Sequence, residues 1–229
     1  MSDMPDICKE RWFQLWRHVD AEGNPKPIWN KIVSQYGEPH RKYHTILHIH
    51  QCLNELETLW QEVSDPYLIA WALWFHRYYY DVNPPGNNKE RSALEAIQVA
   101  CNASVQTHIA VNAGWLILGT KDHTATAHTL VTLSTTDLNV FRGIDLSILG
   151  KPWPTYDLYR RNIRQEYIHI PWELYARKRS EILRGFAQQE RIFHHPSLYE
   201  QYDKRAKENL RREIRLLQRS EERNAEATT

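Results

Sequence analysis

The chain has 229 residues, a formal net charge of +1, 41% hydrophobic and 25% charged residues. These are ordinary proportions for a globular protein with a core, and the balanced charge excludes a global electrostatic attraction to nucleic acid or to an anionic membrane. Only eight glycines argue against a protein built from sheets and tight turns, and no apolar run approaches the roughly 20 residues of a membrane span.

Apolar residues recur at helical spacing through most of the chain, which predicts an all-α fold of about nine to ten helices in one compact domain. Asp65 and Pro66 have the residue types of a helix N-cap and first turn. The helix that they open is apolar nearly all round, so we expect it to be central and buried. Helices are expected over 5–19, 27–36, 43–60, 66–80, 89–102, 105–119, 126–148, 156–168, 172–189 and 202–223, with a frayed tail at 224–229.

The three cysteines are Cys8, Cys52 and Cys101. Because they are odd in number, widely spaced and form no CxxC pair, they indicate neither a disulfide framework nor a thiolate zinc site. The first residues lack the apolar stretch of a signal peptide, so we expect a cytoplasmic protein. The oligomeric state is left open, with a homo-oligomer as one option.

Four of the twelve histidines crowd the start of the third expected helix, and His44 and His48 are four residues apart. At that spacing two imidazoles project from one helical face, where they can serve one metal, or one metal and one phosphate. The alternative is a pair of histidines on a partly exposed helix start.

His76 lies within the apolar stretch WALWFHRYYY and is followed by Arg77. A buried imidazole needs a hydrogen-bond partner or a metal to offset its desolvation. It can therefore be a ligand or a satisfied core histidine. A guanidinium keeps its charge, so Arg77 must face solvent, a carboxylate or a bound anion.

Two carboxylates, Asp137 and Asp145, lie eight residues apart among apolar residues, close to one helical face. Asp145 can pair with a bound cation, or it can be a cap or a buried ion pair with an arginine such as Arg142 or Arg164. Upstream of them, the segment LGTKDH places Thr120 and His123 at a helix end.

A histidine-rich helix, a histidine in an apolar helix followed by a charged residue, and a distant aspartate resemble the HD superfamily of metal-dependent phosphohydrolases. The similarity runs from about residue 41 to residue 210. It implies one HD-type domain over 1–223, with its core at 41–150 and C-terminal helices at 155–223. The matching stretches are RKYHTILHI, WFHRYYYD, NNKERSA, LGTKDH, DLNVFRGIDLSILG, YRRNIRQEY and RAKENL.

This resemblance implies a divalent metal, Mn, Fe, Zn or Mg, bound by His48, His76 and Asp145. It implies a small phosphate-bearing substrate. The catalytic residues that it implies are His44, Asp81, Glu90 and His123. The residues that it implies for phosphate binding are Arg77, Lys89 and Thr120.

Three departures from the family pattern remove negative charge or add positive charge at this site. Arg77 stands where the family has aspartate, Gly143 replaces one of two acids, and Lys89 stands where an acid often precedes Glu90. A unit charge about 5 Å from a divalent ion interacts with it by roughly 6–7 kcal/mol at an effective dielectric of about 20. Metal affinity should therefore be reduced.

The retained histidines and Asp145, set against the lost negative charge, leave two possible functions. The first is a working phosphohydrolase of a small phosphoester or nucleotide. The second is a catalytically degenerate relative that binds a phosphate-bearing ligand or a partner without metal, or that serves only as a scaffold.

The last expected helix carries eight basic and four acidic residues between 204 and 223. This helix could be a surface for nucleic acid. Its mixed signs and apolar stripe favour a solvated amphipathic helix instead.

Overall fold

The computed structural model describes residues 4–83, 86–120 and 133–226, with side chains up to residue 218. Within these ranges the protein contains ten helices of at least ten residues and no β-strand, which confirms the predicted all-α fold. None of the described helices is both long and apolar enough to cross a membrane. The chain divides into two compact units, Met1–Ile144 and Asp145–Thr229. The single domain implied by the resemblance stays a prediction.

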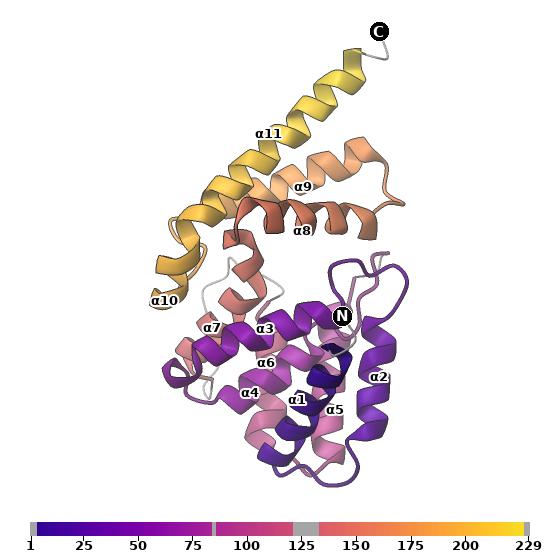
Figure 1. Cartoon of the computed structure of the whole chain (residues 1–229), viewed down its shortest axis with the longest axis vertical. Coiled ribbons are helices and arrows are strands. Elements are labelled where there is room, and N and C mark those ends of the chain that lie inside the picture. Colours follow the sequence, from indigo (N-terminus) through magenta and orange to yellow (C-terminus); the bar gives the residue numbers. More distant parts are fainter. Residues whose placement is uncertain (1–3, 84–85, 121–132, 227–229) are drawn as a thin grey trace. The chain divides into compact units, whose positions relative to one another are not determined.

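In its described residues the first unit contains six complete α-helices and most of a seventh. Figure 1 shows their arrangement. Helix α4 contacts α1, α3, α5 and α6, so it is central as expected. The bounds are α1 (Met4–His18), α2 (Lys26–Tyr36), α3 (Ile46–Thr58), α4 (Pro66–Phe75), α5 (Asn88–Asn102), α6 (Thr107–Leu118) and α7 (Thr135–Leu146).

Tryptophan rings form the contact between α1 and α4. Trp12 is fully buried and its ring centroid lies 5.4 Å from that of Trp71 and 5.7 Å from that of Trp74. Every residue from Leu68 to Phe75 is buried, which explains why α4 has no polar face. Aromatic pairs of this kind contribute about 0.5–1.5 kcal/mol each beyond their burial, and they fix α4 as a rigid base for the residues that follow it.

Helix α4 begins as predicted but ends earlier. The Asp65 carboxylate accepts a hydrogen bond from the Leu68 backbone N–H at 2.9 Å, which confirms the N-cap. The expected helix to residue 80 is wrong, because α4 ends at Phe75 and His76 is its C-cap. Side chains from outside the helix bind the carbonyl groups that a longer helix would use: Tyr36 Oη donates to Trp74 O at 3.0 Å, and Arg41 Nη1 donates to Arg77 O at 2.7 Å.

Two further helix bounds also differ from expectation. Helix α7 begins at Thr135 and residues 133 and 134 are not helical, so the continuous helix expected over 126–148 is interrupted. Residues 121–132 lie outside the described part of the chain. The last helix, α11, is Lys204–Glu226, and residues 227–229 of the expected tail lie outside the description.

The second unit is organised by a buried ion pair. Glu213 of α11 accepts hydrogen bonds from Arg179 Nε at 2.9 Å and from Tyr156 Oη at 2.5 Å. These bonds join α11 to α9 and α8. The bounds are η2 (Ser147–Gly150), α8 (Trp153–Glu166), α9 (Trp172–Ala187), α10 (Pro196–Leu198), η3 (Tyr199–Asp203) and α11 (Lys204–Glu226).

Candidate metal centre

His48 and His76 meet in the core of the first unit. His48 lies in the first turn of α3 and His76 is the C-cap of α4. Their Nε2 atoms are 3.1 Å apart, and the residues are 2% and 0% exposed. The two histidines that were proposed from the sequence as ligands therefore approach each other closely.

One nitrogen of His76 already has a backbone partner. Its Nδ1 lies 2.7 Å from the Leu73 carbonyl oxygen. A carbonyl oxygen only accepts hydrogen bonds, so Nδ1 must carry the proton and donate it. The other ring nitrogen of His76, Nε2, faces Nε2 of His48. Metal-binding histidines are commonly oriented in this way, with the other ring nitrogen held by a carbonyl or a carboxylate.

Cys52 supplies a third donor atom. Its Sγ lies 3.7 Å from both Nδ1 and Nε2 of His48, and the residue is 2% exposed. The three donor atoms of His48, Cys52 and His76 lie within 4.8 Å of one another. Cys52 was not among the ligands predicted from the sequence, because it is not part of a CxxC pair. The signal was its position four residues after His48, which puts both side chains on one face of α3.

The spacing and chemistry of this set fit a metal ion. Two imidazole nitrogens at about 2.0–2.1 Å from one zinc in tetrahedral geometry lie about 3.3–3.4 Å apart, close to the 3.1 Å found here. Imidazole suits Zn, Cu, Fe and Ni, and thiolate favours Zn and other soft cations over Mg. The cluster could therefore hold a metal ion, and its thiolate disfavours Mg among the four metals expected.

His44 lies next to this cluster. Helix α3 begins at Ile46, so His44 precedes the helix instead of lying within it as expected. Its ring centroid is still 5.6 Å from that of His48, and 4.4 Å from that of Tyr80. The residue is buried beside the candidate ligands, at a place consistent with the substrate-facing role that the resemblance implies.

Permanent cations surround the turn that contains His76. Arg41 is buried and donates to the carbonyl oxygens of His44 (3.3 Å), Arg77 (2.7 Å) and Tyr78 (2.8 Å). Lys89 Nζ donates to the carbonyl oxygen of His76 at 3.3 Å. Arg77 is half-buried, and its Nε atom is inaccessible to solvent. The backbone of the histidine–arginine doublet is thus held by cationic side chains.

Several other predicted residues have local structural roles in the first unit. Asp81 is exposed, and its carboxylate accepts from the Asn83 N–H at 2.8 Å. The Thr120 hydroxyl donates to Ile117 O at 2.7 Å, at the end of α6. Asp137 accepts hydrogen bonds from the backbone N–H groups of Ser64 (2.7 Å) and Asp65 (3.2 Å). It therefore binds the backbone directly before α4.

The remaining predicted residues are placed as follows. Glu90 lies in the first turn of α5, half-buried, with a buried Oε2 atom. His123 lies outside the described residues. Asp145 is the first residue of the second unit, and its part in a ligand set stays a prediction. Arg142 donates to Gly119 O, at 2.8 Å.

Comparisons of the chain with protein-family models, with curated proteins and with solved structures gave no match.

Proposed function

We propose that this protein is a metal-dependent phosphohydrolase of a small phosphoester or nucleotide, with the metal held by His48, Cys52 and His76. The observation that supports this most is the buried cluster, in which His76 Nε2 faces a second imidazole beside a thiol. A bound divalent cation supplies a Lewis acid and lowers the pKa of water. Asp145, by resemblance, completes the set in this proposal.

The residues of the chain itself would orient the substrate. Arg77 and Lys89 are the candidates for the phosphate oxygens, because guanidinium and ammonium groups donate charge-assisted hydrogen bonds to phosphate. Lys89 Nζ is already at the His76 carbonyl. A phosphate held by this side chain would therefore lie beside the cluster. Arg41 would act indirectly, by holding the backbone of Arg77 and Tyr78 in place.

A second candidate is a phosphate-binding protein that uses no metal. It is favoured by the cations Arg77 and Lys89 at the His76 turn, because positive charge opposes a divalent cation and attracts an anion. The charge of Arg41 is already paired with Glu38, at 2.9 Å. In this case the 3.1 Å contact is a hydrogen bond between the Nε2 atoms of His48 and His76.

Metal content and turnover separate the two candidates. The purified chain would be incubated with Mn, Fe or Zn, desalted, and assayed by mass spectrometry for metal and with p-nitrophenyl phosphate for hydrolysis. We expect near-stoichiometric metal and metal-dependent hydrolysis, both lost in His76→Ala and retained in the control His194→Ala, which changes an exposed histidine. Absence of metal, with a rise in melting temperature on adding inorganic phosphate, would instead establish the second candidate.

A further inference from the structure

A small pocket opens on the second unit between α8, α9 and α11. Its volume is about 130 Å³. Its lining includes Arg164 and Gln165 of α8, Trp172 and Tyr175 of α9, and Leu217 of α11. The lining lies wholly in the second unit, whereas the metal cluster belongs to the first. The pocket is therefore considered apart from the metal site.

The guanidinium of Arg164 is held in place by its surroundings. Its Nη1 atom donates to the carbonyl oxygens of Tyr167 (2.6 Å) and Ile170 (3.1 Å), beyond the end of α8. Its Cζ atom lies 4.7 Å from the ring centroid of Tyr175 and 5.5 Å from that of Trp172. Such cation–π contacts restrict the orientation of a guanidinium. Arg164 is therefore ordered before any ligand binds, and an ordered group loses little freedom on binding.

One side of this guanidinium is not used by the protein. Among the described residues, Nε and Nη2 of Arg164 have no hydrogen-bond acceptor and no carboxylate partner, and neither atom is buried. The N–H groups of Nε and Nη2 point the same way, at a spacing that matches the two oxygens of a carboxylate. Arg164 therefore presents two parallel donors to an anion.

The lining as a whole has a surplus of donors and of positive charge. The indole Nε1 of Trp172 is buried and has no acceptor among the described residues. Arg160 and Arg161, which also line the pocket, share the single carboxylate of Asp157 at 2.5 and 2.8 Å. Residues 145–229 include 17 lysines and arginines against 13 aspartates and glutamates. A buried donor without an acceptor calls for a partner, and in a pocket with this charge the partner that fits is an anion.

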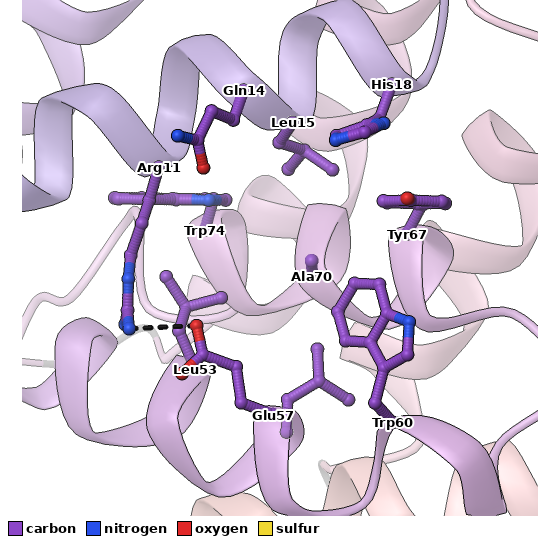
Figure 2. A pocket seen from close by; sticks show the side chains of 11 residues that line it. Arg11, Gln14, Leu15, His18, Leu53, Glu57, Trp60, Tyr67, Ala70 and Trp74 are labelled. Carbon is purple, nitrogen blue, oxygen red and sulfur yellow. Dashed lines mark hydrogen bonds and ion pairs between the residues drawn. The ribbon is translucent and has the colours of Figure 1, made fainter.

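A hollow of similar size on the first unit, between α1, α3 and α4, lacks this feature (Figure 2). Its arginine, Arg11, donates through Nη2 to Glu57 Oε1 at 2.9 Å, shown by the dashed line in Figure 2. The charge of Arg11 is thus paired within the protein, whereas that of Arg164 is not. Of the two, the pocket of the second unit therefore points to an anion.

The acidic and apolar parts of the lining favour a carboxylate over a phosphate. Glu213 lines the pocket, with its carboxylate already bonded to Arg179 and Tyr156, and Leu217 adds an apolar side chain. A phosphate has oxygens on all sides and a charge of about −1.5 to −2, so some of its oxygens would face the glutamate or the leucine. A carboxylate carries one charge, and its oxygens lie at one end of the molecule.

The volume limits the ligand to a short molecule. An apolar cavity of about 150 Å³ in another protein holds one benzene molecule, so a pocket of about 130 Å³ holds about six non-hydrogen atoms. We propose that this pocket binds a short aliphatic carboxylate of that size. Its two oxygens accept from Nε and Nη2 of Arg164, and its hydrocarbon chain lies toward Leu217. This inference does not depend on the metal or on the phosphohydrolase function.

The probes are butyrate, its neutral amide butyramide, which has the same size, and inorganic phosphate. Binding to the full chain in Tris chloride is followed by NMR of the nitrogen-15-labelled indole groups of its nine tryptophans, with the Trp172 signal assigned through Trp172→Phe. We expect butyrate to shift this signal with a Kd on the order of 1 mM. We expect it to bind at least roughly tenfold more tightly than butyramide or phosphate, because hydrogen bonds to a charged acceptor are the stronger ones.

Two variants locate the site. Arg164→Lys keeps the charge but cannot donate two parallel hydrogen bonds, and it should weaken butyrate binding at least roughly tenfold. Gln165→Trp fills the pocket from an exposed position and should abolish binding. Arg177→Lys, which changes an exposed arginine of α9, is the matched control.

The proposal is overturned if the Trp172 signal does not move with butyrate, or if butyramide or phosphate binds as tightly. It is also overturned if both pocket variants bind like Arg177→Lys. If Arg164→Lys does not fold, Gln165→Trp alone decides.

Discussion

The Nε2 atoms of His48 and His76 lie 3.1 Å apart in a region that excludes solvent. Nδ1 of His76 donates to the Leu73 carbonyl oxygen, so a proton between the two rings belongs either to His48 Nε2 or to Nε2 of a doubly protonated His76. Either that proton or a metal ion must join the lone pairs, because two lone pairs facing each other in a low-dielectric core would repel. The functional question of this protein is therefore which of the two is present.

Replacing the cluster thiol should weaken zinc binding selectively. Cys52→Ser removes a soft ligand, and we expect a loss of at least about tenfold in zinc affinity, the size seen even for outer-shell partners. In the cobalt-loaded protein the thiolate-to-metal charge-transfer band should disappear. Cys8→Ser changes a cysteine that is buried in α1 and should leave both unchanged. Equal spectra for the two variants would remove Cys52 from the ligand set.

Arg41→Ala should destabilise the first unit strongly. The side chain is 0% exposed and donates to three carbonyl oxygens, which would lose this donor. Each unsatisfied buried acceptor costs about 1–3 kcal/mol, so the free energy of unfolding in urea should fall by at least about 3 kcal/mol. Arg17→Ala, which removes an arginine that is 66% exposed, is the control. A similar small effect for both variants would contradict the bracing role of Arg41.

Tyr175→Phe should change the alkaline stability of the second unit. Burial, opposed by Arg179 and reinforced by Glu213, raises the pKa of Tyr175 to about 12. Above pH ~10 the unfolded chain releases this proton and the folded chain keeps it. The free energy of unfolding therefore falls as pH rises from about 10 to 12, by up to about 1.4 kcal/mol per pH unit.

Tyr175→Phe should flatten this decline in urea unfolding measured between pH 9 and 11.5, and the exposed Tyr199→Phe should not. Other buried tyrosines such as Tyr156 contribute to the decline as well, so the difference between variant and parent is the informative quantity. Parallel curves for Tyr175→Phe and the parent protein would refute the assignment.

Two glycines of the second unit should respond to alanine in opposite directions. A Cβ on Gly150 would lie 2.5 Å from the Cβ of Tyr202, whereas a Cβ on Gly185 would meet nothing within 4 Å. Gly150→Ala should cost about 1–3 kcal/mol through overpacking. Gly185 lies inside α9, so Gly185→Ala should add up to about 1 kcal/mol. Thermal unfolding of both variants tests the pair, and a stabilised Gly150→Ala would show that η2 and Tyr202 move apart easily.

The helical periodicity and the Asp65 cap were readable from the sequence because they depend on neighbours within one or two turns. The end of α4 was not, because it depends on Tyr36 and Arg41, which lie more than 30 residues upstream and bind the carbonyl groups at its end.

The candidate site was predictable in part. The resemblance, together with the place of His76 in an apolar stretch, selected both histidines, and the structure brings them together. Asp137 could not be assigned from its apolar neighbours, because its partners are backbone N–H groups more than 70 residues away.

The buried guanidinium of Arg41 bears on the distance between the two histidines of the cluster. It holds the His44 and Tyr78 carbonyl oxygens at once, so the segment before α3 and the turn after α4 keep a fixed separation. The span between His48 and His76 is therefore set by a residue that contributes no donor atom to the cluster. A shorter or longer cation at position 41 would adjust that span while every donor atom stays chemically unchanged.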